Sequence, residues 1–313
     1  MNNKTVLITG ASGFLGTWLA DALFASGYDI IGVDLRAPLK PRIWANFMTA
    51  STDNADWESL LSGRFLHAVY HLAGGASVAL SVSDPYSDFS NLLPGTARMA
   101  LYLVKHQPQA RFVFFSSAAV YGNVQVLPTN EDVFKQPISP YGVHKYLAES
   151  LLEDYSRIYS LHVTVLRIFS VYGPGLRKQL IWDVSNRALQ AQADGQTQIE
   201  LFGTGAETRD FIYVKDLCDS IISLLQIPPA KLYEVLNMAS GVEVSITEIA
   251  NCILKHLDVG ITATFDGQIP KGDPFNMKAD VSRLSKKQIF MKYDLDKGIK
   301  EVTDWVVNQQ IEQ

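Results

Sequence analysis

The chain of 313 residues contains only two cysteines, Cys218 and Cys252, and has no apolar run long enough to span a bilayer. So few cysteines exclude a disulfide framework, which favours a reducing compartment, and we expect the cytoplasm. No signal-peptide pattern precedes the first expected strand. A net charge of −5 argues against a general nucleic-acid-binding surface. The six histidines show no metal-ligand spacing, so we expect no structural metal.

A glycine-rich turn follows the first expected strand, residues 4–9. Its sequence, Gly10-Ala11-Ser12-Gly13-Phe14-Leu15-Gly16, leads into an amphipathic helix that ends near Ser26. Glycines allow a tight turn and let the backbone approach a diphosphate at the helix N-terminus. The spacing Gly-x-x-Gly-x-x-Gly differs from the commoner Gly-x-Gly-x-x-Gly, but the strand before it and the helix after it are the context of a dinucleotide site.

The second expected strand, residues 28–34, ends in an acidic residue about twenty positions after the glycine turn. A carboxylate at this place accepts hydrogen bonds from the hydroxyl groups of the adenosine ribose. It disfavours a 2′-phosphate, so Asp34 favours NAD over NADP. Arg36 lies two residues further and can accommodate that phosphate, which keeps NADP possible.

A second motif begins with Ser139 and Pro140. Serine is a good helix N-cap, and proline suits the first helical position because its missing N–H would have no partner there. Tyr141 and Lys145 are therefore four residues apart on one helix and share a face. Tyrosine titrates near 10, and a fixed ammonium nearby favours its phenolate form. The spacing thus predicts a tyrosine whose pKa is lowered by a lysine.

Ser117 ends the apolar strand of residues 111–115. Its hydroxyl can hydrogen-bond a substrate oxygen. We interpret Ser117, Tyr141 and Lys145 as one reaction centre that moves a proton while a cofactor moves a hydride. The alternative is that Tyr141 and Lys145 lie on a solvated helix face and have no catalytic role. The serine at the strand end and the capped start of the helix argue against this alternative. His71, at the end of another buried strand, is interpreted as a packed residue rather than a catalyst.

Strands and helices alternate through the first half of the chain. This pattern predicts an α/β fold: a Rossmann-type doubly wound parallel sheet with a smaller C-terminal α/β substrate domain. We assign residues 1–170, with about 209–237, to a dinucleotide-binding domain, and about 171–208 and 238–313 to a substrate-binding domain. The expected helices after the first glycine turn cover residues 95–106, 141–159, 181–193, 216–225, 245–257 and 296–307.

Over nearly its full length the chain resembles the extended short-chain dehydrogenase/reductase family, in its nucleotide-sugar epimerase and reductase branch of UDP-galactose 4-epimerase-like enzymes. The matching motifs are Thr9 to Gly16, Asp34, His71 to Gly74, Ser116 to Gly122, Tyr141 to Lys145, Leu166 to Pro174 and Thr208 to Val214. The resemblance implies a homodimer built on the two long helices, residues 95–106 and 141–159. It also implies a nucleotide-diphosphate sugar as substrate.

The resemblance assigns roles residue by residue. Those implied to bind the cofactor are Gly10, Ser12, Gly13, Phe14, Leu15, Gly16, Asp34, Leu72, Ala73, Gly74, Tyr141 and Lys145. Those implied to contact the substrate are Ser77, Ser117, Ser170, Lys178, Gln179, Arg209 and Lys271. Arg209 is expected on the sugar-nucleotide diphosphate, because its planar fork suits phosphate oxygens. A salt bridge with Glu207 or Asp210 is the alternative for this arginine.

The chain departs from the family pattern at several positions, and one of these departures bears on the reaction type. Dehydratases carry Asp-Glu directly after the active-site serine or threonine, where this chain has Ala118-Ala119, so we do not expect dehydration. Other departures are Leu92 in place of an asparagine on the cofactor side, and Ser170, Lys178-Gln179 and Pro270 on the substrate side. They leave the nucleotide and the sugar undetermined.

Three functions follow in order of preference. The first is an NAD-dependent nucleotide-sugar epimerase that oxidises and re-reduces C4 of the sugar, with Tyr141 as base and acid. The second uses the same residues once, in an NAD(P)H-dependent reductase of a 4-keto-6-deoxy nucleotide sugar. The third is a dinucleotide-binding sensor without chemistry, against which the complete set of Ser117, Tyr141 and Lys145 argues.

Overall fold

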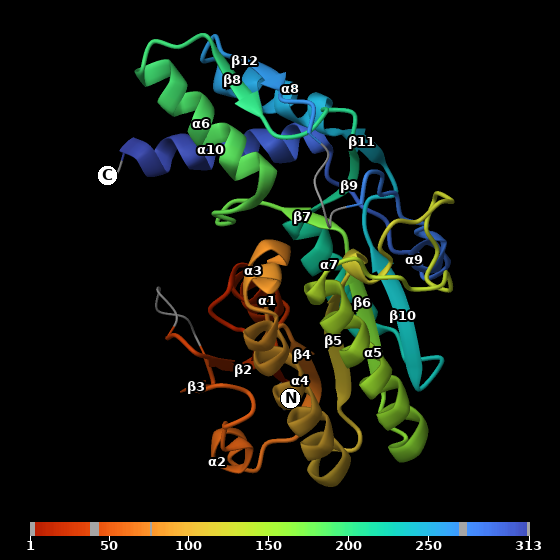
Figure 1. Ribbon diagram of the computed structural model, residues 1–313. Helices are drawn as coiled ribbons and strands as arrows, with labels where there is room; N and C mark the ends of the chain where they lie inside the picture. The colour runs from red at the N-terminus through yellow and green to blue at the C-terminus, as the bar shows by residue number, and fades with distance from the viewer. Residues whose placement is uncertain (1–3, 38–43, 76, 269–273, 312–313) are drawn as a thin grey trace. The chain divides into compact units, whose positions relative to one another are not determined.

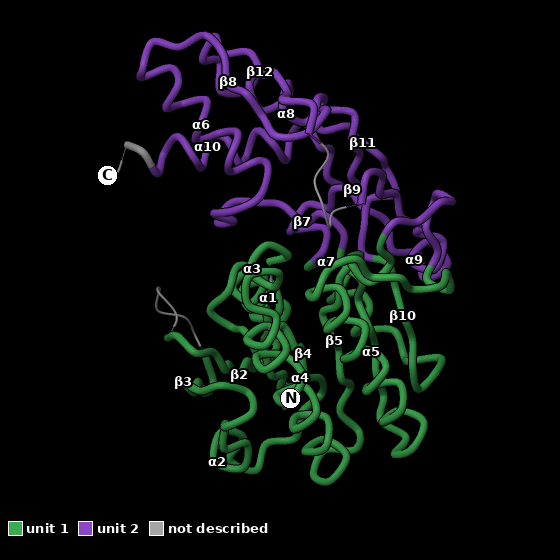
Figure 2. The backbone as a smooth tube through the Cα atoms, in the orientation of Figure 1, with its two compact units in different colours: residues 1–122, 131–168, 218–237 green, residues 123–130, 169–217, 238–313 purple. Residues whose placement is uncertain are grey.

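The computed structural model describes residues 4–37, 44–75, 77–268 and 274–311 (Figure 1). The chain forms two compact units, and it passes between them several times (Figure 2). Unit 1 contains residues 1–122, 131–168 and 218–237, and unit 2 contains residues 123–130, 169–217 and 238–313. Which unit binds cofactor and which binds substrate remains a prediction from the sequence.

Unit 1 is built on a seven-stranded sheet. Its strands are β1 (Thr5–Thr9), β2 (Asp29–Asp34), β3 (Asn46–Thr49), β4 (Leu66–His71), β5 (Arg111–Ser117), β6 (Val163–Ile168) and β10 (Tyr233–Met238). They lie in the order β10-β6-β5-β4-β1-β2-β3, and neighbours from β3 to β6 pair in parallel. The direction of winding therefore reverses between β1 and β4, the place where such sheets bind ligands. The expected doubly wound fold is confirmed.

Helices cover this sheet on both faces. They are α1 (Phe14–Ala25), α2 (Trp57–Leu61), α3 (Val78–Ser83), α4 (Pro85–His106), α5 (Pro140–Tyr159) and most of α7 (Val214–Gln226). One buried cluster joins α2, α4 and α5 to strand residues such as Leu7 and Phe112. Alternate strand residues such as Val6 point the other way and are also fully buried, and α1 contacts β1 and β2. Burial on both faces explains why these strands are almost continuously apolar.

Helix α4 is longer than the sequence analysis predicted. It begins at Pro85, where the Asp84 side chain accepts a hydrogen bond of 2.9 Å from Ser87 N and proline occupies the first turn. The expected helix over residues 95–106 is only its C-terminal part. The prediction was wrong because Pro94 lies inside the helix, where proline usually ends one.

Unit 2 combines two small sheets with helices. Its strands are β7 (Ser170–Tyr172), β8 (Gln198–Leu201), β9 (Thr208–Tyr213), β11 (Glu243–Ser245) and β12 (Thr262–Phe265). Its helices are α6 (Gln179–Ala193), α8 (Ile246–Leu257), α9 (Ser282–Lys286) and α10 (Leu295–Ile311). A second buried cluster forms where α6, α8 and α10 pack together. Across the described ranges, we find no helix both long and apolar enough to cross a membrane.

Candidate active site

The glycine turn lies at the carboxyl end of β1, against the end of β4. Gly10 has φ +70°, and a Cβ atom on it would lie 2.9 Å from Ala73 N. A Cβ on Gly16 would lie 2.2 Å from Gly10 O. These contacts require glycine and bring the predicted cofactor segments 10–16 and 72–74 together. Helix α1 begins directly after Gly13, with no side-chain cap and no acidic residue in its first turn.

The turn therefore fits a dinucleotide. The first backbone N–H groups of a helix have no intrahelical partner and carry partial positive charge. In α1 these groups belong to Phe14 and Leu15, the residues predicted to hold the diphosphate.

Asp34, at the end of β2, is held by the turn itself. Its Oδ2 accepts a hydrogen bond of 3.0 Å from Ser12 N, and its Oδ1 accepts one of 3.0 Å from Arg36 N. The Ser12 hydroxyl donates to Arg36 O over 2.7 Å. Each carboxylate oxygen retains a lone pair, so Asp34 is fixed in place and can still accept a ribose hydroxyl.

His71, at the end of β4, is fully buried, as the sequence analysis expected. Its Nδ1 lies 2.9 Å from Thr9 Oγ1, and its Nε2 lies 2.9 Å from Thr96 Oγ1. The Thr96 hydroxyl donates to Leu92 O, so Nε2 carries the proton and Nδ1 accepts from Thr9. Thr9 Oγ1 in turn accepts from Ala73 N over 3.2 Å. This chain of bonds fixes the backbone that the cofactor is predicted to contact.

Burial, together with a smaller effect of the charge of Lys145, lowers the pKa of His71 to about 3. Because the unfolded chain takes up this proton near pH 6.5 and the folded chain does not, stability falls as the pH drops below 6.5. Between pH 6.5 and 4.5 we expect the wild type to lose about 2–3 kcal/mol more than His71→Gln. Urea unfolding at several pH values measures this difference. The exposed His106→Gln control should keep the wild-type slope, and equal slopes for all three proteins would contradict the expectation.

The predicted reaction centre is assembled at the end of β5. Ser139 caps α5 by accepting a hydrogen bond from Gly142 N over 3.2 Å, and Pro140 occupies the first turn. A Cβ on Gly142 would lie 2.5 Å from Ala119 O, so the start of α5 packs directly on the segment after Ser117. The Ser117 hydroxyl is close enough to the Tyr141 hydroxyl to stabilise the phenolate and so to lower the pKa of Tyr141. Strand end and capped helix thus bring together the two hydroxyls that the sequence singled out.

Lys145 is buried one turn further along α5. Its Nζ donates to Phe115 O over 2.9 Å and lies 5.8 Å from the centroid of the Tyr141 ring. Burial lowers the pKa of Lys145 to about 8, against the opposing charges of Asp88 and Glu149.

Burial raises the pKa of Tyr141, and the hydrogen bond from Ser117 opposes that shift only in part. The prediction that Lys145 lowers the pKa of Tyr141 is therefore wrong for the protein without bound cofactor or substrate. The physical reason is that desolvation dominates while the Lys145 ammonium bonds to a backbone carbonyl.

Sequence reasoning missed two side chains that support this centre. The first is Asp88 of α4, whose Oδ2 lies 2.6 Å from Nδ1 of His144. Its negative charge raises the pKa of Lys145 and so favours the ammonium form. The second is Ser81 of α3, whose Oγ accepts a hydrogen bond of 3.0 Å from Tyr141 N.

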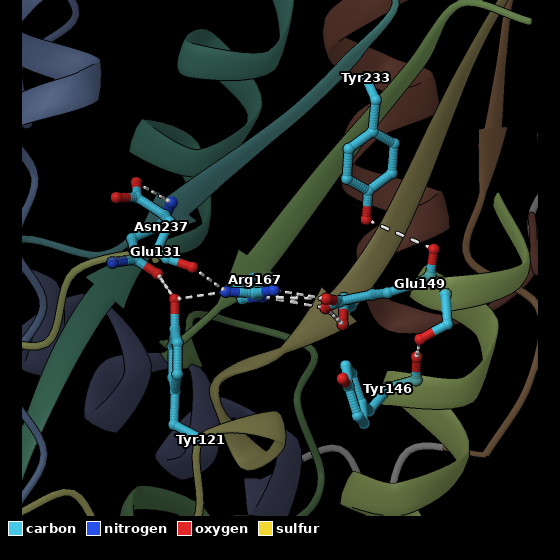
Figure 3. Close-up of polar contacts among 9 residues, drawn as sticks. Tyr121, Glu131, Tyr146, Glu149, Arg167, Tyr233 and Asn237 are labelled. Atoms are coloured by element: carbon cyan, nitrogen blue, oxygen red, sulfur yellow. Dashed lines mark hydrogen bonds and ion pairs between the residues drawn. The ribbon is translucent and has the colours of Figure 1, made fainter. Parts of the chain in front are cut away.

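A buried ion pair joins α5 to the sheet beside the centre (Figure 3). Arg167 of β6 and Glu149 of α5 are 2.6 Å apart, with both side chains 2 % exposed. Arg167 also donates to Glu131 O and to the hydroxyl of Tyr121. Ser116, next to the predicted catalytic serine, donates to Glu149. The pair therefore fixes α5, which carries Tyr141 and Lys145, against the strand that carries Ser117.

Most residues predicted to bind substrate belong to unit 2. Ser170 of β7 pairs with Phe211 of β9, the strand that carries Arg209. Arg209 donates to the backbone oxygens of Thr208 (2.8 Å) and Phe275 (3.1 Å). Within unit 2 the strand pairing thus places Ser170 and Arg209 in one small sheet.

The remaining predicted substrate residues occupy three other places. Lys178 and Gln179 form the start of α6, and burial lowers the pKa of Lys178. In unit 1 Ser77 caps α3 by accepting from Leu80 N over 3.2 Å, which accounts for a serine at this position. Lys271 lies outside the described residues. Substrate contact stays a prediction for all of them.

Several known proteins similar to this chain are 4-epimerases of UDP-sugars. A UDP-glucose 4-epimerase of Mycolicibacterium smegmatis is 32% identical over 258 residues, covering 79% of this chain and 80% of the relative. The structure of the UDP-glucose 4-epimerase of Thermotoga maritima with UDP-glucose has a TM-score of 0.87 and 28% identity, covering 98% of this chain and 99% of that one. The UDP-glucuronic acid 4-epimerase of Bacillus cereus, in complex with UDP-glucuronic acid and NAD, gives 0.85 and 27%, with coverages of 97% and 99%.

The chain also matches a sequence family, over a range that includes the predicted cofactor turn and reaction centre. The profile of the NAD dependent epimerase/dehydratase family matches residues 6–239, which include the glycine turn, Asp34 and the centre at Ser117, Tyr141 and Lys145. The chain belongs to the NAD-dependent epimerase/dehydratase family.

Proposed function

We propose that this protein is an NAD-dependent epimerase that inverts C4 of a UDP-sugar. The observation that carries the proposal is the packing of the start of α5 on the end of β5, which brings Tyr141 beside Ser117 with Lys145 one turn along the same helix. The glycine turn and Asp34 supply a matching site for NAD. The three relatives described above are all 4-epimerases. None of them supports the alternative function of a 4-ketoreductase.

Tyr141 is the group that moves the proton. Its phenolate takes the proton of the C4 hydroxyl and later returns it, while Ser117 hydrogen-bonds the same oxygen and orients it. The ammonium of Lys145 stabilises the phenolate and is itself kept charged by Asp88. NAD, which the glycine turn and Asp34 would hold, would supply the acceptor for the C4 hydride and the same hydride for the return step. Inversion requires that the 4-keto sugar present its other face before the hydride comes back.

Uridine as the base is supported by the relatives, which act on UDP-glucose or UDP-glucuronic acid. Arg209 and Lys178 are candidate partners for the diphosphate of the substrate, because their positive charges suit its phosphate oxygens.

The test is an incubation of the purified protein with UDP-glucose, UDP-glucuronic acid and UDP-N-acetylglucosamine in deuterated water. We expect at least one of them to equilibrate with its C4 epimer without net change in NADH and without deuterium at C4. Intact return of the same hydride explains both features. Consumption of NADPH with a 4-keto sugar, and no epimerisation of any UDP-sugar, would overturn the proposal in favour of the reductase.

A homodimer through α4 and α5 is part of the proposal. These helices pack together and expose large apolar side chains, among them Phe89, Val143 and Leu147. We expect Leu147→Asp to convert the dimer into a monomer, because a charge at the centre of an apolar interface is costly to bury. Phe24→Asp on α1, a side chain of similar exposure (45% against 44%), should leave the dimer intact. Sedimentation velocity distinguishes the two species, and a monomeric wild type would refute the dimer.

A cytoplasmic location is also part of the proposal. Both cysteines are free thiols, as expected for a reducing compartment, and fractionation of cells that express the protein would test it.

A further inference from the structure

Three metal-ligating side chains converge on one point of unit 2. Cys252 and His256 are four residues apart on α8 and therefore share a face, and Asp296 lies in the first turn of α10. One ligand atom from each lies within 4.8 Å of the other two. Cys252 Sγ is 3.5 Å and His256 Nε2 is 3.0 Å from Asp296 Oδ1.

The two separations that involve Asp296, 3.5 Å and 3.0 Å, are close to those of a tetrahedral zinc site. Zinc bonds of about 2.3 Å to sulfur and about 2.0 Å to nitrogen and oxygen place the ligand atoms roughly 3.3–3.5 Å apart. Thiolate, imidazole and carboxylate are all ordinary zinc ligands. The side chain of Asp296 is half-exposed, so water can reach the fourth position.

Hydrogen bonding explains only part of the cluster. The Cys252 thiol donates to Asp296, and the exposed Lys255 ammonium lies 3.3 Å from the same oxygen. His256 Nε2, however, is buried and, among the described residues, has no well-aligned hydrogen-bond partner, although Asp296 Oδ1 is near. An ion pair with Asp296 is one account of this ring nitrogen, and a metal ion at the meeting point of the three groups is another.

We propose that Cys252, His256 and Asp296 bind a zinc ion that ties α8 to α10. On binding, Sγ loses its proton to solvent, the neutral imidazole and the carboxylate each donate a lone pair, and Lys255 gives up its surface ion pair with Asp296, which contributes little. The earlier expectation of no metal rested on the spacing of the histidines alone and did not consider a cysteine one helical turn before one of them.

Metal binding to the full chain, without a histidine tag and stripped by a chelator, tests the proposal. We expect one zinc ion per chain in competition with a chromophoric chelator, and a thiolate-to-metal charge-transfer band with Co²⁺. Cys252→Ser should weaken zinc binding at least about tenfold and abolish the band. Asp296→Asn should weaken binding similarly but keep the band, and its half-exposed position protects it from misfolding. Zinc should also raise Tm of the wild type but not of Cys252→Ser.

Cys218→Ser is the matched control, because that cysteine is buried in another helix and should affect neither binding nor the band. The proposal is overturned if the stripped wild type takes up no zinc, if Cys252→Ser and Asp296→Asn bind as tightly as wild type, or if Cys218→Ser alone abolishes the band. The site and the proposed epimerase activity are independent, because no residue of the reaction centre takes part.

Discussion

Tyr141→Phe is expected to lower kcat for epimerisation by about 10²–10⁴, because it removes the group proposed to take and return the C4 proton while conserving the ring. Binding of NAD should change little, since the glycine turn and Asp34 are untouched. Stability should change by only about 1 kcal/mol, the value of the lost hydrogen bond to Ser117. Initial rates with the best UDP-sugar, together with the NAD content of the purified variant, measure both effects.

Tyr155→Phe is the matched control. It removes the same hydroxyl from the same helix, where the ring packs against the sheet core rather than at Ser117. A Tyr141→Phe enzyme as active as Tyr155→Phe would show that the proton is carried by another group. Loss of bound NAD in Tyr141→Phe would instead mean that the tyrosine acts through the cofactor site.

The placement of Tyr141 and Lys145 on one capped helix could be predicted because its signals are local. Ser139 and Pro140 mark the start of a helix by capping alone, and the four-residue spacing then fixes the shared face of Tyr141 and Lys145. The glycine turn is equally local, since its glycine spacing between strand and helix is read from adjacent residues; only the approach of Gly10 to Ala73 depends on the pairing of β1 with β4. Such features depend on neighbouring residues and need no knowledge of the tertiary fold.

The supporting groups could not be found in this way. Asp88 was overlooked because Pro94 concealed the first turns of α4, although Asp84 and Pro85 form a good helix start. Its pairing with His144 depends on how α4 packs on α5, which no spacing within one helix reveals. The pKa of Tyr141 was misjudged for the same reason, because the direction of its shift is decided by burial and by the carbonyl that holds Lys145.

Glu149→Gln is expected to lower the free energy of unfolding by about 3–5 kcal/mol. The change leaves the guanidinium of Arg167 buried without its countercharge, in a place where both side chains are only 2 % exposed. An unpaired buried charge is far more costly than the pair, so the loss exceeds the value of a single hydrogen bond. Urea unfolding of the full chain, followed by tryptophan fluorescence, measures the loss. Catalysis should fall as well, since α5 is held to β6 by this contact (Figure 3).

The same helix provides a control with the same geometry and a different environment. Asp154 and Arg157 are also 2.6 Å apart, but their side chains are 60 % and 70 % exposed. Asp154→Asn should therefore cost at most about 1 kcal/mol, as surface pairs do. The double variant Glu149→Leu/Arg167→Met should recover much of the stability, because it removes both charges at once. Equal losses for Glu149→Gln and Asp154→Asn would mean that burial does not set the energy of this pair. In that case the ion pair could not be what holds Tyr141 and Lys145 against Ser117.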